Sequence, residues 1–137
     1  MQKNIVLYIF LLVLLGSCGK HKYPSTLVEA DSLCYSNPKL ALKKLVKIGK
    51  DLDTANTADW MYYRLIKLKA QDKAYIPHPD LKNINQLIEY YEGNGDKKLL
   101  PEAYYLAGST YFDLHDSPQA LDYYHKVLDN ITAKDDL

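Results

Sequence analysis

The side chains that most often carry out chemistry in proteins are scattered through this sequence of 137 residues. None of the four histidines has a cysteine or carboxylate at a metal-binding spacing. No glycine-rich segment follows a strand-like segment, and no serine has the surroundings of a hydrolase nucleophile. Asp113 and Asp116 could approach each other, but acids on solvated helix faces are the commoner case. We therefore expect no enzymatic activity, no metal site and no cofactor.

Cys18 stands at the end of a segment that is typical of exported proteins. Residues 1–4 carry one basic side chain, and residues 5–15 are apolar except for Tyr8. A helix needs about 20 apolar residues to span a bilayer, so this run is too short to remain as a spanning helix. The pattern predicts a secretory signal over residues 1–17.

The four residues Leu15-Gly16-Ser17-Cys18 resemble the lipobox of bacterial lipoproteins. The resemblance implies cleavage before Cys18 and acylation of its thiol and amine. More than one acyl chain anchors a protein stably, because each buried methylene contributes about 0.8 kcal/mol. Residues 18–24 would then form a polar tether. Since no aspartate or acidic run follows the cysteine, the resemblance implies an outer-membrane lipoprotein that faces the periplasm.

Helical periodicity dominates the rest of the chain, and no stretch alternates apolar and polar residues long enough to suggest a sheet. Clusters of proline, glycine and asparagine divide it at regular intervals. Ser25, Thr57 and Asp80 are expected to cap three helices, and glycine or asparagine at positive φ is expected in the turn over 93–96. The pattern predicts six short helices near 25–36, 38–52, 57–70, 80–91, 98–114 and 117–131.

The residues from Pro101 onward resemble a tetratricopeptide repeat, a helix-turn-helix unit. The resemblance implies that Gly108 and Ala120 are small because two helices cross there, with tyrosines filling the space beside them. Thr132 departs from the family, which usually has proline at this position. The positions that match the family's signature are Tyr104, Ala107, Gly108, Tyr111, Ala120, Tyr124 and Val127.

The earlier hairpins match less closely, although Asn37–Leu42 resembles the start of a second helix. The chain over 25–134 is thereby similar to exported tetratricopeptide lipoproteins of Gram-negative gut bacteria. The resemblance implies an all-α fold of three antiparallel helix hairpins, stacked as a short right-handed solenoid. It also extends to residues 30–33, 58–60, 75–77 and 90–96.

In such solenoids the first helix of each hairpin lines the concave face. Two aromatic rings, two acids and a hydroxyl on that face would suit a bound peptide or protein segment. Alternatively, Phe112 packs against a neighbouring helix. In the last repeat, the positions that the resemblance places on this face are Glu102, Tyr105, Ser109, Phe112 and Asp113.

The composition is that of an ordinary domain, with 17 basic and 17 acidic residues. This balance offers no strong field for nucleic acid. The 13 tyrosines suit half-buried helix seams and binding surfaces equally well. Cys34 is expected to be buried and to form no disulfide, and Thr54 fits a short bacterial O-glycosylation pattern.

Together these features predict a membrane-anchored, non-enzymatic module that binds a protein or peptide. Two alternatives are the sensory N-terminal part of a longer tetratricopeptide regulator and an accessory lipoprotein of outer-membrane glycan uptake. The sixth helix is expected to stop near Ile131, and no capping helix follows it. We therefore expect a truncated or partial gene product, or an edge that binds something.

Overall fold

The computed structural model describes residues 21–135, and these residues form helices and their connections without a strand. The expected all-α class is confirmed. The predicted signal segment 1–17 and Cys18 lie outside the described residues. The helices are α2 (Ser25–Ser36), α3 (Pro38–Asp51), α4 (Thr57–Lys73), α5 (Leu81–Gly93), α6 (Leu100–Asp113) and α7 (Ser117–Asp135).

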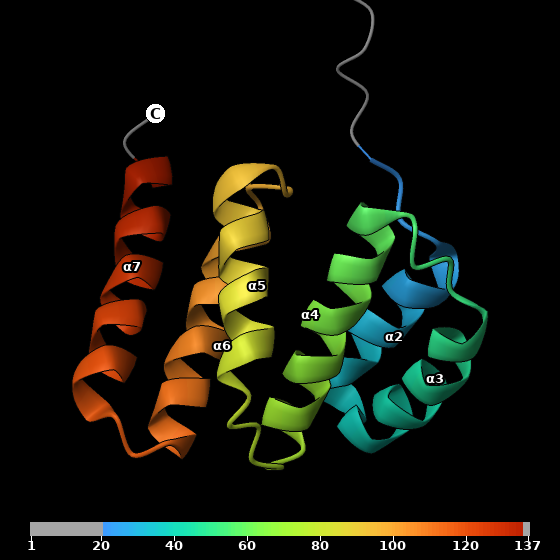
Figure 1. Cartoon of the computed structure of the whole chain (residues 1–137), viewed down its shortest axis with the longest axis horizontal. Coiled ribbons are helices and arrows are strands. Elements are labelled where there is room, and N and C mark those ends of the chain that lie inside the picture. Colours follow the sequence, from blue (N-terminus) through green and yellow to red (C-terminus); the bar gives the residue numbers. More distant parts are fainter. Residues whose placement is uncertain (1–20, 136–137) are drawn as a thin grey trace, which may run out of the picture.

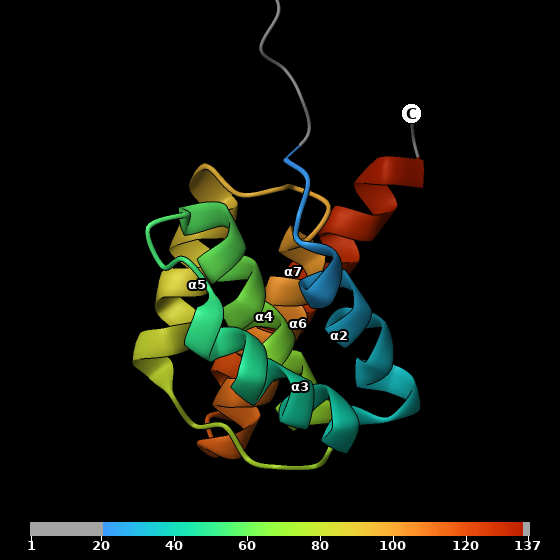
Figure 2. The same cartoon turned by 90° about the vertical axis from the view of Figure 1, so that its right-hand side faces the viewer.

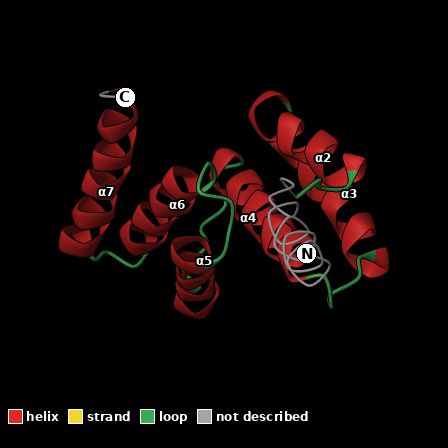
Figure 3. Ribbon diagram, turned by 90° about the horizontal axis from the view of Figure 1, so that it is seen from above, coloured by secondary structure: helices red, strands yellow, loops and turns green. Residues whose placement is uncertain are grey.

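Helix α4 joins the two halves of the molecule. It contacts α2 and α3 on one side and α5 and α6 on the other. In Figure 1 it stands between the blue-green pair α2 and α3 and the yellow and orange helices. Figure 2 places α5 and α2 at opposite sides with α4 between them, and Figure 3 shows α7 and α3 at opposite ends. Any site built on α4 is therefore reached from two different faces.

Asparagine and aspartate side chains begin four of the helices. The side chains of Asn37, Asn56, Asp80 and Asp116 each accept the backbone N–H three positions on, at 3.1, 3.2, 3.0 and 3.2 Å. Such caps satisfy donors that have no partner inside the helix. Pro38 follows Asn37 at the first helical position, where its missing N–H costs nothing. The cap predicted at Asp80 is confirmed.

The caps predicted at Ser25 and Thr57 are wrong. Both residues are the first of their helices rather than the residue before it. Asn56 takes the capping position that was expected for Thr57. At α2 no side chain caps the helix, and the carbonyl of Pro24 accepts the N–H groups of Leu27 and Val28 at 3.0 and 3.2 Å. A Ser or Thr beside a helix start does not by itself reveal which residue leaves the helical conformation.

The residues with left-handed backbone are also not those predicted. Tyr75 and His115 have φ of 57° and 61°, whereas no described glycine has positive φ. In both cases the next residue's N–H bonds to the carbonyl five positions back at 2.9 Å, which closes the end of α4 or α6. After α5, Lys97 Nζ donates instead to the carbonyl of Tyr91 at 2.7 Å and to that of Gly93 at 3.1 Å. The lysine satisfies carbonyls that a left-handed glycine would otherwise help to satisfy.

Two apolar clusters form the core, and α4 contributes to both. Ile66 and Ala70 face α2 and α3, whereas Leu65 and Leu68 face α5 and α6. Successive helix positions are about 100° apart, so one helix can present apolar residues to two neighbours. Cys34 lies in the first cluster and is fully buried, as predicted. Burial raises the pKa of its thiol to about 12.

The crossing of α6 and α7 depends on one glycine. A Cβ added at Gly108 would lie well inside van der Waals distance of the ring of Tyr124. Ala120 is almost fully buried at the start of α7. Tyr111 stacks on Tyr123 with ring centroids 5.5 Å apart. The expectation that small residues bring these two helices together is confirmed.

Helix α7 continues to Asp135, so the expectation that the sixth helix stops near Ile131 is wrong. Leu121, Leu128 and Ile131 are each about half exposed on it. Across residues 21–135, no helix is long and apolar enough to cross a bilayer.

Candidate binding surface

The five residues predicted for a concave face share helix α6, and three of them contact helix α4. Glu102 Oε1 lies 2.7 Å from Lys69 Nζ, and Ser109 Oγ donates to Asp72 Oδ1 at 2.5 Å. The Tyr105 hydroxyl donates to Asp72 Oδ2 at 3.2 Å. These contacts tie the predicted residues to α4 rather than leaving them free.

The remaining two residues differ from each other. Asp113 Oδ2 accepts the backbone N–H of His78 at 2.8 Å and so holds the connection between α4 and α5. Phe112 is 64 % exposed, which argues against the alternative that it packs on a neighbouring helix of the described chain.

Lys69 is the centre of the polar contacts that join α2, α4 and α6. Its Nζ lies 2.7 Å from Asp31 Oδ1 and the same distance from Glu102 Oε1, and its side chain is only 8 % exposed. Burial alone would lower the pKa of Lys69, but the hydrogen bonds to the two carboxylates outweigh burial and raise it. Tyr62 adds a hydrogen bond to Asp31 Oδ2 at 2.8 Å. Three helices are therefore held by one buried cation.

A second cluster centres on Asp72 at the end of α4. Besides Ser109 and Tyr105, it contacts Lys73 Nζ at 3.0 Å and His78 Nε2 at 3.6 Å. Burial opposes ionisation, yet these hydrogen-bonding partners hold the pKa of Asp72 well below its usual range. His78 is itself buried, and its Nδ1 lies 3.0 Å from Thr110 Oγ1.

Aromatic rings surround these paired charges. Tyr35 on α2 is 68 % exposed, and its ring lies 5.0 Å from Lys69 Nζ. Lys73 Nζ lies 4.6 Å from the centre of the Tyr105 ring. We name this region, formed by α2, α4 and α6 together with Val127 of α7, the aromatic face. A shallow cavity of about 260 Å³ opens on it, lined by Tyr35, Lys73, Pro101, Glu102, Tyr105 and Val127.

Of the residues that line this surface, Glu102 and Tyr105 were predicted from the resemblance to a repeat, and their partners were missed. Asp31 and Lys69 belong to otherwise apolar helix faces, beside Ala30 and Ala70. A charged residue on an apolar face must find a partner when it is buried, and that was the available signal. Which carboxylate meets which lysine depends on helix packing, so spacing alone could not supply the pairing.

The histidines serve the structure in different ways. His21 Nε2 lies 2.7 Å from Asp59 Oδ1, and its ring packs edge-on against Tyr23 at 4.9 Å. His78 lies in the Asp72 cluster. Among the residues that the structure describes, no three His, Cys, Asp or Glu side chains are grouped so that they could hold a metal ion.

Comparison with known proteins adds nothing to this geometry, since no family model, no curated protein and no solved structure matches the chain.

Proposed function

We propose that this protein is a lipid-anchored, non-enzymatic interaction module that holds a protein or peptide on its aromatic face. In this proposal the six helices form three tetratricopeptide-type hairpins, stacked as a short right-handed solenoid. Helices α2, α4 and α6 would be the first helices of these hairpins and would line its concave side. The contacts of α4 with both α2 and α6 support this arrangement.

One observation carries the binding proposal. Exposed aromatic rings of Tyr35 and Tyr105 lie over lysines that are already paired within the chain, and exposed Phe112, seven positions after Tyr105, shares that side of α6. Such a surface is held in place before a partner arrives, so little side-chain entropy remains to be lost on binding. Aromatic residues are also enriched at the energetic centres of protein interfaces.

The start of the described chain supports anchoring close to the membrane. His21 and Tyr23 pack on α4, where Tyr23 lies 4.1 Å from the ring of Tyr62. Only two residues separate Cys18 from His21. An extended residue spans at most about 3.6 Å, so an acyl group on Cys18 would keep this end of the domain within roughly 10 Å of the lipid surface.

The anchor and the binding face are tested separately. Cells that express the full chain would be fed an alkyne-bearing fatty acid, and the label on the protein would be measured. We expect label and membrane fractionation in the wild type and loss of both in Cys18→Ser. Label that persists in this variant would refute the anchor without touching the binding proposal.

For the binding face, a photo-crosslinking amino acid would replace Tyr35, Phe112 or Val46 in turn. Val46 is 61 % exposed on α3 and is the matched control, because it lies outside the aromatic face. We expect discrete protein adducts from the first two positions only. Equal adducts from all three positions, or none from any, would contradict the proposal.

A further inference from the structure

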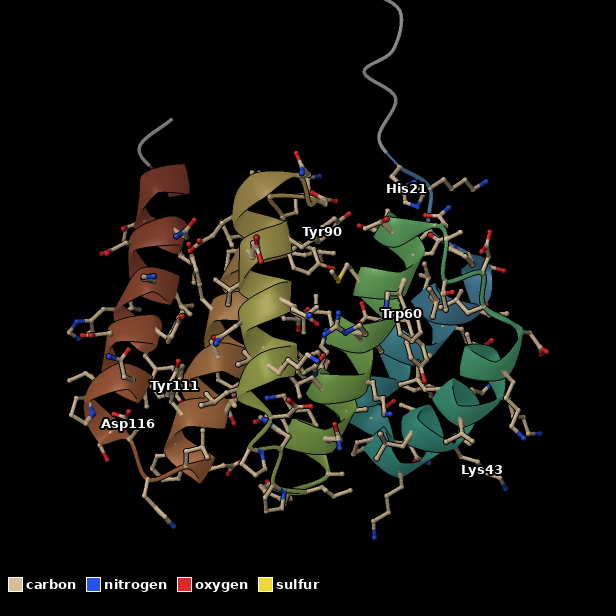
Figure 4. All side chains as sticks on the ribbon, in the orientation of Figure 1. His21, Lys43, Trp60, Tyr90, Tyr111 and Asp116 are labelled. Atoms are coloured by element: carbon tan, nitrogen blue, oxygen red, sulfur yellow. The ribbon has the colours of Figure 1, made fainter. Side chains whose placement is uncertain are left out.

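A groove runs along the opposite side of α4 from Lys69. It has a volume of about 450 Å³, which lies within the range of small-molecule sites. Its length follows α4 from Trp60 to Gln71, about 16 Å at 1.5 Å per residue. Figure 4 shows Trp60 on the face of α4 that is turned toward the viewer. The second wall is the start of α5 with the residues just before it.

The groove exists because α4 and α5 touch over a small area, whereas each packs extensively on other helices. Leu68 is buried at its floor, and Tyr63 is buried where α4 meets α3. Trp60 stacks on Tyr63 with ring centroids 5.3 Å apart and planes 15° from parallel. The aromatic end of the groove is thus held rigidly by the core.

Arg64 is the chain's one arginine among 17 basic residues. Its Nε donates to Asn83 Oδ1 at 2.8 Å, and its Nη2 donates to Gln86 Oε1 at 2.8 Å. Its Nη1 meets only the sulfur of Met61, at 3.4 Å, which is a weak acceptor. Burial lowers the pKa of Arg64, although Asp80 opposes this. No carboxylate of the described residues lies within salt-bridge distance of this half-buried cation.

Two further polar side chains of the groove also have donors without partners in the described chain. Lys67 Nζ, one turn from Arg64, forms no ion pair there, and the side chain of Gln71 makes no hydrogen bond there. Asn83 uses its oxygen for Arg64, which leaves its NH₂ group to donate. One carboxylate, Asp80, shares the lining, and it accepts the N–H of Asn83 at 3.0 Å. The net charge of the lining is therefore positive by one.

We propose that this groove binds a small ring-bearing carboxylate, with the carboxylate on Arg64 Nη1 and Lys67 and the ring against Trp60. A partly buried guanidinium without a carboxylate is costly, and a bound carboxylate offsets that cost. The two cations can neutralise a single carboxylate in spite of Asp80, but a polyphosphate would bring more negative charge than they balance. Gln71 and Asn83 add donors for ring hydroxyls, which favours a hydroxylated ring over a plain aromatic one.

Trp60 is the single tryptophan of the chain, so its fluorescence reports on this groove alone. The full chain, purified in detergent, would be titrated with galacturonate, benzoate and the neutral sugar galactose. We expect a saturable change in emission with a carboxylate and at least tenfold weaker binding of galactose. Binding of galacturonate alone identifies a hydroxylated ring, and binding of benzoate alone identifies an aromatic ring; either result, or binding of both, supports a ring-bearing carboxylate. No change with either carboxylate, or equal binding of galactose, overturns the proposal.

Two variants locate the carboxylate. Arg64→Gln should weaken binding about tenfold or more, since a hydrogen bond to a charged group contributes about 1.5–3 kcal/mol. Lys67→Gln should weaken it about threefold, and Lys44→Gln on α3 should leave it unchanged. Because Arg64 also contacts Asn83 and Gln86, circular dichroism checks that variant, and the exposed Lys67 supplies the test if it fails to fold. Wild-type affinity in Lys67→Gln together with wild-type affinity or misfolding in Arg64→Gln would refute the assignment.

Discussion

Helix α4 carries basic side chains on both of its sides, but within the described residues only those on one side are paired with carboxylates. On the aromatic face, Lys69 and Lys73 are paired with carboxylates at 3.0 Å or less. On the groove side, Arg64 and Lys67 have no carboxylate partner among the described residues. Lys67 and Lys69 are only two positions apart, but about 200° of helix rotation sends them to opposite sides. The local sequence therefore says little about whether a basic side chain is paired within the fold or is free to bind a ligand.

This difference separates two uses of charge. A buried cation with two carboxylates joins helices, and removing it leaves both acids unpaired. A cation at the edge of a groove contributes little to folding and keeps its donors for a ligand. His78 lies where the two regions meet, since it lines the groove and also belongs to the Asp72 cluster. A ligand in the groove would thus contact a residue that helps to order the other side.

The largest expected effect is the loss of the Lys69 cation. Lys69→Met should lower the free energy of unfolding by about 3 kcal/mol, because Asp31 and Glu102 would remain poorly solvated without a partner. Urea unfolding followed by circular dichroism measures the change. Lys44→Met is the control, since its pair with Glu29 is solvent-exposed and should contribute less than about 0.5 kcal/mol. Similar losses in both variants would remove the distinction between paired and exposed lysines.

The next effect concerns Asp72 and depends on pH. Asp72→Asn should cost about 2 kcal/mol at pH 7, because it weakens several hydrogen bonds to a buried carboxylate. The pKa of Asp72 is depressed in the folded protein, so the unfolded chain takes up the proton first as pH falls. The stabilisation is therefore complete above about pH 5 and declines below the ordinary carboxyl pKa.

Unfolding curves of wild type and Asp72→Asn at pH 7, 5 and 3 would check this. The difference in free energy of unfolding between wild type and Asp72→Asn should be smaller at pH 3 than at pH 7. The control is Asp51→Asn, which changes an exposed carboxylate on α3 and should leave the free energy of unfolding nearly unchanged at pH 7. If the difference in free energy of unfolding between wild type and Asp72→Asn stayed constant down to pH 3, the ionised carboxylate would not be what stabilises the end of α4.

The smallest effects are expected on the groove side. Lys67→Gln should change the free energy of unfolding by less than about 0.5 kcal/mol, since Lys67 is exposed and forms no ion pair within residues 21–135. Arg64→Gln should cost about 1 kcal/mol, from its hydrogen bonds to Asn83 and Gln86. Thermal unfolding of Lys67→Gln, Arg64→Gln and Lys69→Met under the same conditions would rank the three variants by their loss of stability. If Arg64→Gln proved as destabilising as Lys69→Met, the groove cation would be structural and the comparison would fail.

Prediction from sequence succeeded where the signal was local. Proline, asparagine and glycine between apolar periods indicated six helices, and the close approach at Gly108 followed from one repeat with a strong family resemblance. Prediction failed where two nearby residues could each satisfy the same backbone groups at a helix end. Asn56 rather than Thr57 caps α4, and Lys97 rather than a left-handed glycine satisfies the end of α5. Both alternatives satisfy the same backbone groups, so residue types alone could not choose between them.

The sequence by itself determined the helical class and the breaks between helices, because these depend on periodicity and turn chemistry within a few residues. Only the tertiary structure decided that Lys69 meets Asp31 and Glu102, residues 38 and 33 positions away along the chain. It also decided that Arg64 faces a groove in which no carboxylate of residues 21–135 comes within salt-bridge distance of it. Such pairings depend on how α4 is rotated between its four neighbours, and that rotation is set by the packing of the whole core.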